Sequence, residues 1–127
     1  MASWLGQYCI CVTDLARSED FYSRILGLEV QQHVEIADAR EAVLGAPGKD
    51  AKIQLAQKTA QDGPIEHGNA LWKLYVYTDD IAGVYAAAMD YGSESVMAPT
   101  RLEKWPVTAA FVRDPDGYLV QLMQRHA

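Results

Sequence analysis

The sequence lacks the features of membrane, secreted and nucleic-acid-binding proteins. None of its apolar runs approaches the roughly 20 residues that a membrane-spanning helix needs. Its first residues, Met-Ala-Ser-Trp-Leu-Gly, carry no basic segment and no long apolar stretch, so we expect no secretion signal. Lys and Arg form no cluster, and the net charge of −6 repels phosphate backbones. We therefore expect neither nucleic acid nor membrane as a partner, but a small organic molecule or a second copy of the chain.

Cysteine is scarce as well. Cys9 and Cys11 are the two cysteines, and they lie two positions apart in one apolar segment. In a strand their side chains would project from the same face about 6–7 Å apart, so a disulfide between them would strain the backbone. Two reduced thiols predict a cytoplasmic protein, and we expect both cysteines to be structural.

A repeat divides the sequence into two similar units. Thr13-Asp14 and Thr78-Asp79 each follow an apolar or aromatic run, and each precedes a helical pattern that ends at a glycine, Gly27 or Gly92. The carboxylate of Asp14, and that of Asp79 or Asp80, can cap the first turn of a helix, and a glycine suits its end. Ile-Gln-Leu at 53–55 and Val-Gln-Leu at 120–122 close the two units.

Each unit is therefore predicted to contain one strand, one helix and three further strands. The predicted strands are 7–12, 28–36, 40–44 and 52–57 in the first unit, and 71–77, 95–99, 107–113 and 118–124 in the second. We predict an α+β fold in which a single domain, 1–127, consists of two tandem βαβββ modules. The modules are expected at 1–60 and 66–127, with a polar linker at 58–69.

Motifs at both ends of the chain resemble those of the vicinal oxygen chelate superfamily, which includes glyoxalase I, bleomycin resistance proteins and extradiol dioxygenases. The opening motif is VTDLARS at 12–18, with Phe21-Tyr22 and LGLEV at 26–30, and the closing motif is FVRDPDGY at 111–118, with Gln121-Leu122. The resemblance implies that the modules form an eight-stranded bowl and that the protein is a homodimer. In catalytic members it also implies a divalent metal held by the first and last strand of each module.

The resemblance places the four metal positions at Gln7, Gln54, Lys73 and Gln121. At the third position the register leaves Trp72 as an alternative to Lys73. Catalytic members carry mostly His and Glu at these places, because carboxylates and imidazoles hold a divalent ion against its hydration shell. A Gln amide is a weaker, neutral ligand, and a Lys would add a positive charge beside the ion. We therefore expect no metal and no other cofactor.

The same residues are candidates for ligand binding. Gln7, Gln54 and Gln121 would form an uncharged polar floor, although residues on a solvated sheet face are also often polar. Lys73 would bind an anionic group or act as a base, unless it pairs with a carboxylate or extends into solvent. Tyr75, Tyr77 and Trp105 would stack on a flat aromatic ligand, unless they pack in the core or a dimer interface. No two of the three histidines have the spacing of a metal site.

These residues predict a metal-independent protein that binds a small organic molecule, such as an aromatic natural product or an antibiotic, and sequesters it. One alternative is an enzyme with an atypical site, either a glyoxalase-type lyase or isomerase or an extradiol-type dioxygenase. A second alternative is an interaction module whose pocket is vestigial.

Overall fold

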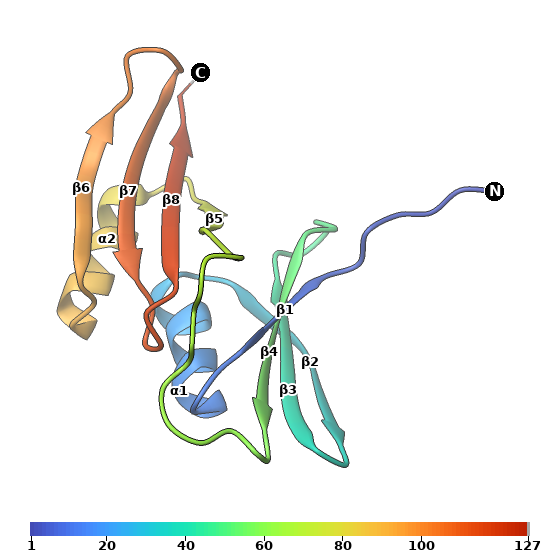
Figure 1. Ribbon diagram of the computed structural model, residues 1–127. Coiled ribbons are helices and arrows are strands. Elements are labelled where there is room, and N and C mark those ends of the chain that lie inside the picture. The colour runs from blue at the N-terminus through green and yellow to red at the C-terminus, as the bar shows by residue number, and fades with distance from the viewer. Residues whose placement is uncertain (127) are drawn as a thin grey trace. The chain divides into compact units, whose positions relative to one another are not determined.

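The computed structural model describes residues 1–126, and the chain separates into two compact units, Met1–Ile65 and Glu66–Ala127. Each unit contains one mixed four-stranded sheet and helical structure after its first strand (Figure 1). This is the predicted fold class, two βαβββ modules of α+β type. No helix within the described residues is long and apolar enough to cross a membrane.

The first unit has the strand order β1-β4-β3-β2, in which β1 runs parallel to β4 and the other neighbours are antiparallel. Its elements are β1 (Tyr8–Cys11), α1 (Leu15–Asp20), the π-helical turn η1 (Phe21–Ile25), β2 (Glu29–Ile36), β3 (Ala39–Gly45) and β4 (Lys52–Lys58). The parallel pair requires a connection that crosses over the sheet, and α1 lies in that connection.

The second unit repeats this arrangement with the order β5-β8-β7-β6 and a parallel β5–β8 pair. Its elements are β5 (Leu74–Tyr77), α2 (Ile81–Tyr91), β6 (Ser95–Arg101), β7 (Val107–Arg113) and β8 (Leu119–Arg125). The strand β5 begins three residues later than predicted. The strand β6 runs past Pro99, which is tolerated because β6 is an edge strand with irregular register.

An aspartate caps the N-terminus of each helix, as predicted. The side chain of Asp14 accepts a hydrogen bond from the backbone N–H of Arg17, and that of Asp80 accepts one from Gly83. Asp80, rather than Asp79, is therefore the cap of α2. At the other end of α2, Gly92 adopts φ +102°, a left-handed conformation that favours glycine.

The first helix departs from a regular α-helix after Asp20. The backbone N–H of Leu26 bonds to the carbonyl of Phe21, five residues earlier, over 3.0 Å. This wider turn belongs to a segment in which the adjacent rings of Phe21 and Tyr22 are both fully buried, edge to face, with centroids 5.3 Å apart. The sequence pattern predicted one continuous helix that ends at Gly27.

The core of each unit lies between its helix and one face of its sheet. Ile10, Leu55, Ala42 and Leu44 are buried on that face of the first sheet, and Val76, Val120, Leu122, Ala110 and Val112 on that of the second. Because side chains alternate along a strand, the residues between them project from the opposite face. We call this opposite face the site face of each unit.

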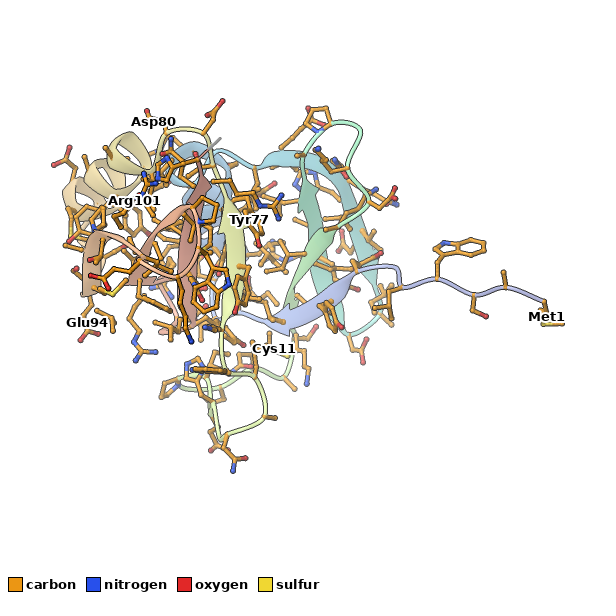
Figure 2. All side chains as sticks on the ribbon, turned by 90° about the horizontal axis from the view of Figure 1, so that it is seen from above. Met1, Cys11, Tyr77, Asp80, Glu94 and Arg101 are labelled. Atoms are coloured by element: carbon orange, nitrogen blue, oxygen red, sulfur yellow. The ribbon has the colours of Figure 1, made fainter. Side chains whose placement is uncertain are left out.

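The segment before β1 differs from both units. In Figures 1 and 2 the first residues extend away from β1, with Met1 at the far end. The side chains of Trp4 and Leu5 in this N-terminal arm, Met1–Gly6, are 87% and 79% exposed. The arm therefore presents apolar side chains without burying them.

Candidate functional site

A hydrogen-bonded chain of polar side chains crosses the site face of the first unit. Gln7 precedes β1 and donates its side-chain amide to the side-chain oxygen of Gln54 on β4 over 2.8 Å. The amide of Gln54 in turn donates to the carboxylate of Glu41 on β3. Two of the predicted site residues are thus bonded directly to each other, and the chain ends on an anion that the sequence analysis did not identify.

Cys9 lies beside this chain and is paired with Gln54 in the strand register. Its thiol is 4.0 Å from the Glu41 carboxylate, to which it donates. Burial raises the pKa of the Cys9 thiol, and the nearby charge of Glu41 raises it further. Cys9 and Cys11 form no disulfide within residues 1–126. A thiol with a raised pKa is a poor nucleophile at neutral pH, in agreement with the expected structural role.

The register of the second unit settles which residue corresponds to Gln7. Cys9 faces Gln54 in the β1–β4 pair, and Tyr75 faces Gln121 in the β5–β8 pair. Two residues before Cys9 is Gln7, and two residues before Tyr75 is Lys73. Lys73, and not Trp72, therefore occupies the equivalent position.

Aromatic rings surround the ammonium group of Lys73. Its Nζ lies 4.2 Å from the ring centre of Trp72, 5.0 Å from that of Tyr75 and 5.3 Å from that of Phe111. These distances fall within the range of cation–π attraction. Among residues 1–126, no carboxylate forms an ion pair with Lys73. The cation is thus held by rings rather than neutralised.

Gln121 lies between two of those rings. In the strand register it faces Tyr75 on β5 and Phe111 on β7, so the three side chains form one row across the site face. Gln121 is only 7% exposed, and its amide nitrogen contacts the sulfur of Met123 at 3.1 Å. Its side-chain carbonyl oxygen is buried and has no hydrogen-bond partner among the described residues, 1–126. A buried acceptor without a donor is costly, and it marks a place where a donor would be stabilised.

The other two aromatic candidates occupy different places. Tyr77 (labelled in Figure 2) lies two residues beyond Tyr75 on β5, with the Arg125 guanidinium 4.4 Å from its ring centre. Trp105 lies in the loop between β6 and β7, outside the sheet, and Lys104 is 5.9 Å from its ring centre. Tyr77 thus extends the Lys73–Tyr75 edge, whereas the structure does not place Trp105 on that edge.

Each of the three histidines has a local partner. His33 contacts Glu19 of α1 at 2.5 Å, His67 contacts the backbone carbonyl of Asp116 at 2.7 Å, and His126 contacts the Thr108 hydroxyl at 2.7 Å. His67 also packs edge to face on Tyr118. In these contacts, no histidine touches Gln7, Gln54, Lys73 or Gln121.

The side chains at the four family positions do not fit a divalent metal. Gln7 and Gln54 are bonded to each other, Gln54 also binds Glu41, and Lys73 brings a positive charge. Nowhere in residues 1–126 do three or more His, Cys, Asp or Glu side chains gather in a way that could hold a metal ion. The donor set is therefore amides and a cation, which suits hydrogen bonding to an organic molecule better than Lewis-acid chemistry.

Two residues of the site faces were missed by the sequence analysis, Glu41 and Phe111. Both lie on the third strand of their unit, whereas the family comparison directed attention to the first and last strands. Period-two alternation in each predicted third strand could have identified them, because Glu41 alternates with Ala42, and Phe111 with Val112.

Comparisons with known proteins agree with this architecture. Residues 4–122 match the family model described as Glyoxalase/Bleomycin resistance protein/Dioxygenase superfamily. A probable lactoylglutathione lyase of Synechocystis is 28% identical over 119 residues, which cover 91% of this chain and 90% of the relative. A lactoylglutathione lyase of Haemophilus influenzae is 29% identical over 117 residues, which cover 89% of this chain and 86% of that protein.

Two solved structures share the fold. Glyoxalase I of Zea mays superposes with a TM-score of 0.83 at 21% identity, over 95% of this chain but only 44% of the maize chain. TnmS3, an antibiotic binding protein from a Streptomyces species, superposes with a TM-score of 0.75 at 22% identity, over 98% of both chains. The tandem βαβββ modules and the family match over most of the chain lead to one conclusion: the chain belongs to the glyoxalase/bleomycin resistance protein/dioxygenase superfamily.

Proposed function

We propose that this protein binds a small organic molecule without a metal and sequesters an aromatic natural product or an antibiotic in the cytoplasm. The observation that carries the proposal is the chemistry of the four family positions. Gln7, Gln54, Lys73 and Gln121 supply three amides and an ammonium group, which form hydrogen bonds and ion pairs with organic ligands. The similarity in fold to TnmS3, an antibiotic binding protein, supports the same class of function.

Two measurements test this proposal. Purification without chelators followed by elemental analysis should find metal far below one equivalent per chain, and stoichiometric Zn, Ni, Fe or Mn would contradict the proposal. Native mass spectrometry of the same sample, together with a thermal-shift screen of aromatic natural products, should reveal a bound or stabilising ligand. A broad screen without any stabilising compound would instead favour a vestigial pocket in an interaction module.

A second candidate function is a lyase or isomerase of glyoxalase type. Two observations favour it: the curated relatives are named lactoylglutathione lyases, and Glu41 supplies a carboxylate next to Gln54. Such a carboxylate could accept a proton from a bound substrate. Turnover of a hemithioacetal that disappears in Glu41→Gln would establish this candidate, and an assay of catechol cleavage would test the dioxygenase alternative.

We also propose that the protein is a homodimer and that the N-terminal arm contributes to the contact. Trp4 and Leu5 are exposed apolar residues on an extended segment, and such side chains are commonly buried against a partner. Analytical ultracentrifugation should show a dimer whose dissociation constant rises in the double variant Trp4→Ser with Leu5→Ser. A monomer at all concentrations would contradict this proposal.

A further inference from the structure

The second unit combines a cation without a counter-ion and an acceptor without a donor on one sheet face. Tyr75, Gln121 and Phe111 form a cross-strand row, and the Lys73 ammonium lies about equally far from the two rings that flank Gln121, at 5.0 and 5.3 Å. The ammonium group therefore lies beside the same two rings between which the strand register places Gln121. Among residues 1–126, no carboxylate forms an ion pair with Lys73, and no donor forms a hydrogen bond with the Gln121 carbonyl oxygen.

We infer that this row is a binding site for a planar aromatic anion that carries a hydrogen-bond donor next to its acidic group. The inference rests on the proposed function and specifies its ligand class. The acidic group would pair with Lys73, and the donor would bind the Gln121 carbonyl oxygen. The ligand ring would lie against the rings of Trp72 and Tyr75, which are 75% and 54% exposed.

The charge of Lys73 and the flat exposed rings favour a planar aromatic anion over other classes of ligand. A cationic ligand would be repelled by Lys73, and by Arg125 further along the same edge, at Tyr77. An aliphatic anion would satisfy Lys73 but would leave the exposed aromatic faces in water. A planar aromatic anion pairs with Lys73 and also covers the exposed aromatic faces, since stacking and a charge-assisted contact then act on one molecule.

The test uses a matched pair of probes, 2-naphthoate and the neutral 2-naphthamide, with binding measured by titration calorimetry. The native protein should bind the acid at least roughly tenfold more tightly than the amide, a preference typical of one charge-assisted contact. Lys73→Gln should abolish the preference for the acid over the amide. Lys104→Gln is the matched control, because Lys104 also lies over a tryptophan ring but outside the row, and it should keep the preference.

A second probe pair examines Gln121. The native protein should prefer 3-amino-2-naphthoate to 3-methyl-2-naphthoate several-fold, because one amine N–H bonds to the neighbouring carboxylate and the other stays free to donate; Gln121→Met should remove that preference. Thermal unfolding of the variant confirms that it folds, and binding of 2-naphthoate confirms that the remaining site is intact. A preference for the amine that persists in Gln121→Met would overturn the assignment of Gln121.

The outcomes separate this inference from the proposed function. Equal binding of acid and amide, or an acid preference that survives in Lys73→Gln, overturns the inference but leaves a metal-independent binding protein. Absence of binding by every naphthalene probe overturns the inference too. The proposed function fails on a different measurement, stoichiometric metal in the purified protein.

Discussion

Gln7 and Gln54 are 47 residues apart in the chain, yet their side-chain amides are joined by a direct hydrogen bond of 2.8 Å. This bond exists because β1 and β4 are parallel neighbours with Cys9 opposite Gln54. In the family pattern the two positions are metal ligands, whereas here the two amide side chains hydrogen-bond to each other. Their bond continues to Glu41, so the three side chains act as one unit.

The first prediction concerns the charge at position 54. Gln54→Glu replaces the donor to Glu41 with a second carboxylate, so we expect the free energy of unfolding at neutral pH to fall by roughly 1–3 kcal/mol. Urea denaturation measures the change. Adding Glu41→Gln should restore most of the lost stability, because a carboxylate and an amide then face each other again. If the double variant is as unstable as the single one, the loss does not arise from this contact.

The second prediction concerns the thiol of Cys9. Burial and the Glu41 carboxylate raise the pKa of the Cys9 thiol above its ordinary value, so less thiolate is present at pH 8 than in an ordinary cysteine. In the Cys11→Ser background, iodoacetamide should react more slowly with the native protein than with the urea-unfolded chain. The half-maximal rate should occur at a higher pH, and adding Glu41→Gln should move it back down. A pH profile unchanged by Glu41→Gln would contradict the electrostatic part of this account.

The third prediction distinguishes two adjacent aspartates at the start of α2. Asp80 caps the helix by accepting from the Gly83 backbone N–H over 3.0 Å, whereas Asp79 forms no such bond in the part of the chain that the structure describes. Asp80→Ala should therefore reduce the free energy of unfolding by about 1 kcal/mol. Asp79→Ala should change it by less than about 0.5 kcal/mol. Chemical denaturation of both variants provides the comparison, and equal losses would show that the cap is shared.

The fourth prediction concerns the end of α2. Gly92 adopts φ +102°, so Gly92→Ala introduces a Cβ into a conformation that costs about 1–2 kcal/mol. Thermal unfolding should show a lower midpoint for this variant. Gly6→Ala is the control, because Gly6 lies in the N-terminal arm without a positive φ and an added Cβ would meet no atom of residues 1–126 within 4 Å. A similar decrease in both variants would exclude the backbone explanation.

The fold was predictable because several local signals agreed. The cap at Asp14 and the glycine at 92 appear where the repeat predicts them, and the second cap is Asp80, one of the two aspartates that the pattern left open. The π-helical turn after Asp20 was not predictable. Phe21 and Tyr22, which are both buried there, also fit the apolar side of a regular α-helix, so their spacing does not reveal the wider turn. Tertiary packing overrides local periodicity at that point.

The candidate site was less predictable than the fold. Alternation placed Gln54, Tyr75 and Gln121 on the correct face, but it did not specify what each side chain binds. The roles of Glu41 and Phe111 depend on strand pairing between β3 and β4 and between β7 and β8, which single-strand periodicity does not contain. Trp105 stays a prediction: its aromatic character suggested a site residue, and its position in the loop between β6 and β7 lies outside the row of Tyr75, Gln121 and Phe111.

The shared register of the two units also bears on how such a chain diverges after duplication of an ancestral module. The helix-facing side is apolar in both sheets. On the site faces, by contrast, equivalent positions differ in chemistry. Glu41 corresponds to Ala109, Val43 to Phe111, and Cys9 to Tyr75. One copy has become rich in hydrogen-bond acceptors and the other aromatic and cationic. The same strand register thus supports two different chemistries, one in each half of the chain.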